Sequence, residues 1–223
     1  TTNSENVDVL YEDNHVIAVN KRVGDIVQGD KTGDTPLSEI VKEFLKQKYH
    51  KPNEAFLGVV HRLDRPTTGI VLFAKTSKAL ARLNAMFAEK TEVQKTYWVL
   101  VDAMPPAKEG TLIHWLVRNE KQNKSVGYEK EVQHSKKAVL HYKVLQAYDR
   151  YYLLEIDLVT GRHHQIRAQL AAIGLHIKGD LKYGAKRSNP DGGICLHAYA
   201  LSFLHPVKKE MVRIQVAPNW AIG

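Results

Sequence analysis

The chain has 223 residues with 32 Lys and Arg against 24 Asp and Glu, which gives a formal net charge of +8 at pH 7. This length is enough for one well-buried core or two small ones, and the basic charge suits a polyanionic partner without proving one. A single cysteine, Cys195, excludes a disulfide framework and a cysteine metal site, and it fits a reduced, cytoplasmic setting. We expect no secretory leader and no membrane association, because the sequence shows no apolar run of the required length.

The first predicted elements are a strand pair and a helix. Two short apolar runs, at 7–11 and 15–20, are typical of a hairpin. Apolar residues then recur at helical spacing, which predicts a helix to about Tyr49 with Thr35 as its N-cap and Pro36 as its first residue.

The middle of the chain alternates strands with a second helix. Apolar runs at 57–60 and 70–74 predict two strands around a tight loop, and residues 94–102 predict a further strand. Ser77 is expected to cap a helix between them. The apolar face of that helix consists of Leu80, Leu83, Met86 and Phe87.

The second half of the chain is predicted to be mostly strand. Residues rich in β-branched, aromatic or alternating side chains occupy 111–116, 138–145, 151–159, 196–204 and 211–216. A short helix is predicted from His163 to Ile173, ended by Gly174 as a left-handed cap. Strands outnumber helices and most links are hairpin-sized, so we expect an α+β domain with a largely antiparallel sheet. No linker interrupts the chain, which favours one domain.

One segment carries an arrangement of charged residues that is typical of a catalytic site. From Val60 to Ile70 the chain places Asp64 between Arg62 and Arg65 on the loop between two predicted strands. Nearby positive charge favours the ionised form of a carboxylate, and loops on a sheet scaffold often hold catalytic groups. The residues alone leave a second interpretation open, a surface loop with a screened ion pair.

Four ordered stretches extend this observation. They are His61-Arg62-Leu63-Asp64-Arg65-Pro66-Thr67-Thr68-Gly69; Gln94-Lys95-Thr96-Tyr97; Gly161-Arg162-His163-His164-Gln165-Ile166-Arg167 with 179–184; and Leu196-His197-Ala198 with 203–206. Together they closely resemble the motifs of the RluA-type pseudouridine synthases, enzymes that isomerise uridine to pseudouridine within ribosomal or transfer RNA. The resemblance runs from about Val7 to the last residues.

The resemblance implies the pseudouridine synthase fold, a bent, mixed sheet with flanking helices and a central catalytic cleft. A single catalytic domain over 1–223 is expected. The small RNA-binding module that precedes it in many relatives is expected to be absent, because the pattern starts at Val7. The reaction breaks the bond from ribose to N1 of uracil and remakes it to C5, so it requires no cofactor and no metal. The implied partner is RNA, and no obligate protein partner is evident.

Three residues receive catalytic roles from the resemblance. Asp64 is the carboxylate that acts on the detached base or the sugar, and its role as nucleophile or as base stays open. Tyr97 stacks on the target uracil, although one of ten tyrosines filling a core is the alternative. Arg167 pairs with the catalytic aspartate, although an arginine beside an apolar seam usually extends to solvent.

Further residues are expected to contact RNA. Arg62 would occupy the gap left by a flipped nucleotide or hold phosphates, and Ile166 and Leu196 would line the uracil site, unless they are ordinary core residues. His61 and Arg162 complete this set. His61 is also, with Thr68 and Gln165, interpreted as a hydrogen bonder that sets the loops.

The chain departs from the family pattern at three positions. Thr68 stands where the family usually has serine, and it keeps the hydroxyl. Arg22 and His176 each stand where the family usually has proline. The change at Arg22 is expected to loosen its loop and to add a charge.

Other functions are less well supported. A catalytically silent RNA-binding module would keep the charge, with clusters at 118–143 and 161–187, but the three catalytic residues are all present. A metal-dependent nuclease would need clustered acids, which the motif region lacks. The adjacent His163 and His164 are expected to point to different faces, so they do not suggest a metal site.

Overall fold

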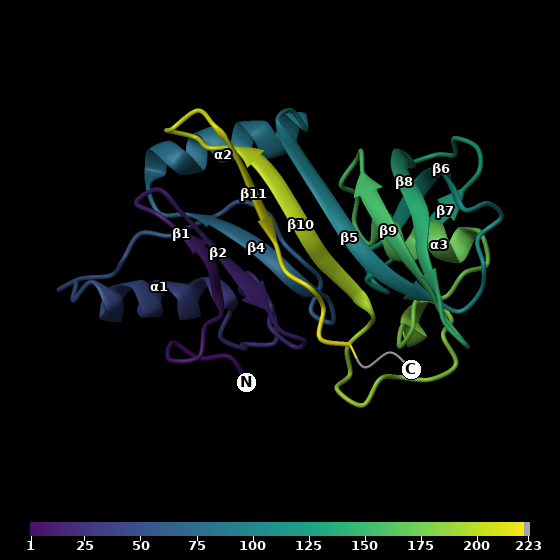
Figure 1. Cartoon of the computed structure of the whole chain (residues 1–223), viewed down its shortest axis with the longest axis horizontal. Coiled ribbons are helices and arrows are strands. Elements are labelled where there is room, and N and C mark those ends of the chain that lie inside the picture. The colour runs from purple at the N-terminus through teal and green to yellow at the C-terminus, as the bar shows by residue number, and fades with distance from the viewer. Residues whose placement is uncertain (221–223) are drawn as a thin grey trace. The chain divides into compact units, whose positions relative to one another are not determined.

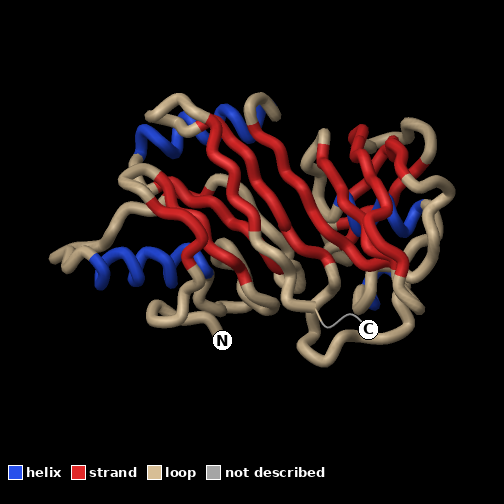
Figure 2. The backbone as a smooth tube through the Cα atoms, in the orientation of Figure 1, coloured by secondary structure: helices blue, strands red, loops and turns tan. Residues whose placement is uncertain are grey.

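The computed structural model describes residues 1–220, and these form two compact units (Figures 1 and 2). The first unit contains Thr1–Gln94 and Ala198–Pro218, and the second contains Lys95–His197 with Asn219 and Trp220. The expectation of a single domain over the whole chain stays a prediction.

The first unit has the strand order β1-β2-β4-β10, in which β2 pairs antiparallel with both β1 and β4. Short β3 pairs with β4, and β11 pairs with β10. Their bounds are β1 Val9–Glu12, β2 Val16–Lys21, β3 Gly58–Val59, β4 Thr68–Ala74, β10 Leu196–Leu204 and β11 Met211–Gln215. β2 and β4 are buried on both faces, which explains why their sequences are continuous apolar runs.

Helix α2 (Ser77–Glu89) covers one face of these strands. Thr76, rather than the predicted Ser77, caps it by accepting from the Ala79 amide at 3.1 Å. The shift follows because Thr76 still has extended backbone while Ser77 is already helical. The core on this face joins alternate strand residues to the helix: Val16, Ala18, Ile70, Leu72, Ala79, Leu83, Phe87, Leu201, Phe203 and Ile214.

Helix α1 (Leu37–Lys48) runs beside β1 and β2 (Figure 1). The predicted start was wrong by one residue, because Pro36 has extended backbone and occupies the N-cap position without a side-chain cap. Lys48 and Tyr49 at the far end bind the two carboxylate oxygens of Glu12 at 2.6 Å each, which fixes the helix to the end of β1.

The second unit has the strand order β5-β9-β8-β6-β7, all antiparallel. The strands are β5 Val93–Val101, β6 Glu109–Asn119, β7 Lys124–Tyr128, β8 Lys136–Ala147 and β9 Tyr152–Leu158. Strand β7 was not predicted. Its apolar Val126 and Tyr128 are exposed while Ser125 is buried, so its sequence lacks the expected hydrophobic pattern.

Helix α3 (Gln165–Ala172) packs against β6 and β7, and a 3-10 turn, η1 (Leu181–Tyr183), follows it. Gly174 has φ +79, as predicted for the residue that ends this helix. Leu116, Ala138, Ala168 and Tyr183 form the core under α3. The α+β class with a largely antiparallel sheet is therefore confirmed. No helix within residues 1–220 is long and apolar enough to cross a membrane.

Candidate functional site

The loop that carries Asp64 connects β3 to β4 in the first unit. The Thr67 amide donates to the Asp64 carbonyl at 2.9 Å and closes a tight turn that contains Arg65 and Pro66. Gly69 follows with φ +116, and a Cβ there would collide with the backbone of Ala198. The turn leaves Asp64 half-buried and Arg62 exposed. The predicted strand–loop–strand is therefore present, with Asp64 half-buried on the loop.

A buried lysine binds the backbone of this loop. Lys21, at the end of β2, is 1% exposed, and its ammonium donates to the carbonyls of Arg22, Arg65 and Thr67 at 3.0, 2.9 and 2.6 Å. Two of these carbonyls belong to the Asp64 loop, on either side of Pro66. Three carbonyl acceptors around one ammonium use all its donors, so the backbone that carries Asp64 is fixed.

The charge of Lys21 also faces the carboxylate. Burial lowers the pKa of the Lys21 ammonium to about 8, because the charged form loses its hydration. Asp25 and Asp64 oppose this shift by attracting the ammonium, while Arg65 adds to it. Sequence analysis did not identify Lys21 as part of the site.

Two arginines bind neighbouring segments: Arg65 from the Asp64 loop, and Arg22 from the end of β2. Arg65 donates to the Gly24 carbonyl at 3.0 Å and lies 3.0 Å from a carboxylate oxygen of Asp34. Arg22 donates to Thr2 Oγ1 at 3.0 Å and to the Asn6 carbonyl at 2.7 Å. Arg22 adds a charge, as expected, and its guanidinium binds the N-terminal segment. The expectation that it loosens its loop stays a prediction.

His61 sets the entry to the loop, as expected from its interpretation as a hydrogen bonder. Its Nε2 accepts from the Leu72 amide at 2.9 Å, and its ring lies 5.1 Å from the ring of Phe87. An imidazole that accepts at Nε2 carries its proton on Nδ1 and is neutral. His61 thus joins the start of the loop to β4 and α2.

The remaining predicted residues lie in the second unit. Tyr97 is in β5, opposite Ile156 of β9, and it is 8% exposed. Leu196, at the start of β10, is 4% exposed and follows Cys195, whose carbonyl accepts from the Leu100 amide of β5 at 3.0 Å.

Helix α3 positions Arg167 and Ile166, which are both buried, at 5% each. The alternative in which Arg167 extends to solvent is excluded, because the side chain is buried and Asp180 binds it at two points. Its Nε donates to Asp180 Oδ2 and its Nη2 to Asp180 Oδ1, both at 2.8 Å. Such a two-point pair fixes the plane of the guanidinium as well as its position.

The segment before α3 is held by Gln165. Its Oε1 accepts from the Arg162 amide at 3.0 Å and from Thr160 Oγ1 at 2.8 Å, which sets the loop as expected. Arg162 is exposed, and its Nε donates to the Lys137 carbonyl at 3.0 Å. Lys136 and Lys137 are exposed as well.

The adjacent histidines do not point to different faces. Their rings stack with centroids 3.8 Å apart, because His164 has left-handed backbone with φ +51. Burial, followed by Arg167 and His163, lowers the pKa of His164 to about 2, so its imidazole is neutral. His163 lies between Ser125 Oγ at 2.8 Å and Asn123 Oδ1 at 3.0 Å. Within residues 1–220 no group of three or more His, Cys, Asp or Glu side chains could hold a metal ion.

Each unit thus supplies a different functional group. The first unit holds the half-buried Asp64 on a loop that the buried ammonium of Lys21 binds. The second unit holds the buried guanidinium of Arg167 and the buried Tyr97. A carboxylate supplies a nucleophile or base, an aromatic ring supplies a stacking surface for a base, and a guanidinium supplies a planar cation. Sequence analysis missed Asp180 as the partner of Arg167, although the Gly179-Asp180 pair lies within the quoted motif.

Comparison with known sequences gives a consistent result. A family model described as RNA pseudouridylate synthase matches residues 15–172. An uncharacterized RNA pseudouridine synthase of Synechocystis sp. is 34% identical over 215 residues, which cover 92% of this chain and 64% of the relative. The ribosomal large subunit pseudouridine synthase D of Xylella fastidiosa is 33% identical, over 95% of this chain and 66% of the relative. The chain therefore spans about two thirds of the length of these relatives.

Solved structures agree on the fold. Human RNA Pseudouridylate Synthase Domain Containing 4 superimposes with a TM-score of 0.78 over 95% of this chain and 89% of that one, at 22% sequence identity. Human RNA Pseudouridylate Synthase Domain Containing 1 gives a TM-score of 0.74 over 98% and 86%, also at 22% identity.

Proposed function

Since the chain belongs to the RNA pseudouridylate synthase family, we propose that it isomerises specific uridines to pseudouridine in ribosomal or transfer RNA. The observation that carries the proposal is the Asp64 loop, in which a buried ammonium binds the Arg65 and Thr67 carbonyls that directly follow the half-buried Asp64. In the reaction the bond from C1′ to N1 breaks, a bond from C1′ to C5 forms, and the proton lost from C5 is balanced by one gained at N1.

We assign the catalytic roles to Asp64, Tyr97 and Arg167. Asp64 acts as nucleophile or base on the sugar or the detached uracil. Tyr97 stacks on the uracil, and Arg167 pairs with the Asp64 carboxylate to keep it ionised and oriented. The burial of Arg167 supports its role, because an ion pair shielded from water is stronger.

The substrate contacts are proposed for five residues. Ile166 and Leu196 line the uracil site of a central cleft, and Arg62 occupies the space left by the flipped nucleotide. His61 orients the loop, and Arg162 binds phosphate. The exposure of Arg62 and Arg162 supports contact with a polyanion.

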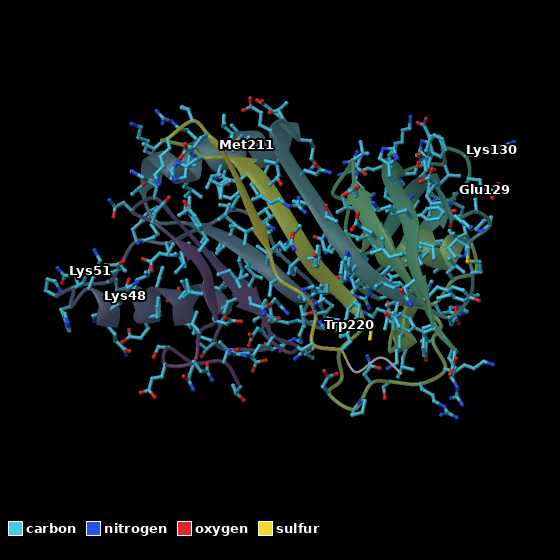
Figure 3. The ribbon with its side chains drawn as sticks, viewed as in Figure 1. Lys48, Lys51, Glu129, Lys130, Met211 and Trp220 are labelled. Carbon is cyan, nitrogen blue, oxygen red and sulfur yellow. The ribbon has the colours of Figure 1, made fainter. Side chains whose placement is uncertain are left out.

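RNA as partner is supported by the formal charge of +8 and by the exposed lysines of the second unit. Glu129 and Lys130, labelled in Figure 3, extend outward beyond β7. The name of the Xylella relative refers to the large ribosomal subunit, which makes ribosomal RNA the first substrate to test. We propose that the protein acts in the cytoplasm without a cofactor, a metal or an obligate protein partner.

Asp64→Asn tests the function. The substrate is RNA carrying tritium at uridine C5, and the assay counts the tritium released as C5 loses its hydrogen. We expect turnover by the wild type and none by the variant, with RNA affinity on filters unchanged within about threefold, since many cations share the binding. Asp102→Asn is the matched control, because Asp102 is an exposed carboxylate that pairs with His176 at 2.7 Å.

Two results would contradict the proposal. Measurable turnover by Asp64→Asn would remove the catalytic assignment. RNA binding by a wild type that releases no tritium would indicate the silent RNA-binding module. Retention of turnover in a chelator would separate the isomerase from a metal-dependent nuclease. Labelling of pseudouridine in cells with and without the protein would then identify the RNA and the position.

A further inference from the structure

The turn that follows α3 has a geometry that its two glycines make possible. Gly179 has φ +89 and Gly184 has φ +106, on either side of η1. A Cβ on Gly179 would meet the Gly193 carbonyl at 2.7 Å, so no other residue fits without movement. Asp180 and Tyr183 lie three residues apart on this turn, and side chains at this spacing in a 3-10 turn lie on one side.

Both side chains are directed at Arg167. The Asp180 carboxylate is 1% exposed and binds Nε and Nη2 of Arg167 at 2.8 Å each. The Tyr183 ring lies under the guanidinium, with its centroid 4.8 Å from Cζ. One residue thus holds an edge of the guanidinium plane and the other holds a face.

The tyrosine ring is itself fixed. Its hydroxyl accepts from the Ser125 amide at 2.9 Å and shares a hydrogen bond with His164 Nδ1 at 2.8 Å. His164 is the residue that precedes α3, so the ring is joined both to β7 and to the start of the helix that carries Arg167. Tyr183 is 6% exposed, which leaves no room for the ring to rotate into solvent.

We propose that Asp180 and Tyr183 are positioning residues for the isomerisation, acting through Arg167. Asp180 binds the guanidinium edge and Tyr183 supports its face, so that the group is held in one plane before RNA arrives. This inference rests on the proposed function, in which Arg167 orients the catalytic carboxylate.

The physical reason is preorganisation. An arginine side chain has several rotatable bonds, and ordering it during the reaction would cost free energy each time. With a buried two-point ion pair and an aromatic ring under it, the side chain is already ordered when the protein folds. The guanidinium then needs no rearrangement in the transition state. Asp180 binds Nε and Nη2, and Nη1 lies 3.4 Å from Nε2 of His164.

The test measures chemistry and binding separately. Single-turnover tritium release is followed with protein in excess over RNA, because the rate constant at saturation then does not depend on the folded fraction. The variants are Asp180→Asn, which keeps the shape and removes the charge, Tyr183→Phe, which keeps the ring, and Tyr183→Leu, which removes it. Asp102→Asn serves as control, and thermal melts report folding of each variant.

We expect Asp180→Asn and Tyr183→Leu to lower the saturating rate constant at least about tenfold, with the half-saturating protein concentration unchanged within about threefold. Tyr183→Phe should stay within about threefold of the wild-type rate, since it retains the ring under the guanidinium. A purely structural role would lower the melting temperature and leave the saturating rate unchanged.

Wild-type rates for folded Asp180→Asn would overturn the inference while leaving the function intact. If that variant does not fold, the tyrosine pair decides, and equal rates for Tyr183→Phe and Tyr183→Leu would overturn it. A wild type without turnover would instead remove the proposed function, and this inference with it.

Discussion

Asp64 and Arg167 are held in place by opposite means. Around Asp64 the backbone is fixed, because the Lys21 ammonium binds the carbonyls of Arg65 and Thr67 while the carboxylate stays half-buried. Arg167 lies in the regular helix α3, and its side chain itself is fixed, because Asp180 binds the guanidinium at two points.

This difference predicts where each region tolerates change. A loop held through its carbonyls keeps its course whatever side chain stands at position 64, so substitutions of Asp64 should affect chemistry and leave stability unchanged. A guanidinium held by a buried carboxylate is part of the core, so substitutions there should affect both. Substitutions on both sides of this contrast, together with the pH dependence of stability, test it.

Lys21→Met removes the ammonium and keeps the length of the side chain. Three carbonyls lose the ammonium, although those of Arg65 and Arg22 keep the amides of Gly24 and Asp25 as donors. A buried group without a partner costs about 1–3 kcal/mol and two further bonds are lost, so we expect a loss of roughly 2–4 kcal/mol in the free energy of unfolding. At about 2–4 °C per kcal/mol, the melting temperature should fall by roughly 5–15 °C. Scanning calorimetry measures it, with Lys42→Met in the exposed Lys42–Glu39 pair as control. Equal melting temperatures for the two variants would show that the ammonium does not support the loop.

Arg167→Lys keeps the charge and removes the planar fork. Lysine cannot bind both oxygens of Asp180 in the geometry that Nε and Nη2 adopt, so we expect turnover to fall at least about tenfold, which corresponds to roughly 1.4 kcal/mol. Steady-state tritium release measures the change. Lys178→Arg provides the reverse exchange outside the pair, at a lysine bound to Asn189 at 2.8 Å. A near-normal rate for Arg167→Lys would mean that charge alone is needed at this position.

The stability of the protein should rise with pH in the alkaline range because of Lys21. Its pKa is lowered from 10.5 to about 8 in the folded protein, mainly by burial. Between these values the unfolded chain binds more protons than the folded one, so this group raises the free energy of unfolding by at most about 1.4 kcal/mol per pH unit. Urea unfolding of the wild type and of Lys21→Met across this range isolates the contribution. Parallel pH profiles for the two proteins would contradict it.

Lys136→Gln should have the smallest effect. Lys136 is exposed and lies opposite Leu116 in the pairing of β8 with β6, on the side of the sheet that α3 covers. If it contacts a phosphate, the slope of log affinity against log salt should become shallower by about 0.7 on single-stranded RNA, with turnover at saturation unchanged. Filter binding at several salt concentrations measures the slope, and Lys42→Gln in the first unit should leave it unchanged.

The sequence predicts elements well where burial follows a simple period. Leu196–Leu204 was placed correctly because nine residues of mostly apolar sequence can only be a buried strand here. Strand β7 was missed because it turns Ser125 inward and Val126 outward. The stacked histidines were missed because adjacent residues diverge only on regular backbone, and His164 has φ +51.

The candidate site shows the same limit. The Asp64 loop was recognisable because its residues are consecutive. Lys21 and Asp180 act on groups that are distant in sequence: the carbonyl of Thr67 lies 46 residues from Lys21, and Asp180 lies 13 residues from Arg167. Charge and spacing alone do not determine which pairs the fold joins, so both partners required the three-dimensional structure.

The way the chain is divided between the units also has a consequence for synthesis. The second unit is almost continuous in sequence, from Lys95 to His197, whereas the first is assembled from both ends of the chain. The core under α2 contains Leu201, Phe203 and Ile214, which leave the ribosome late. We expect the second unit to fold while translation is still under way. The strands around Asp64 cannot complete their sheet until β10 and β11 have been synthesised. Until then we expect their apolar edges to be exposed and available to chaperones.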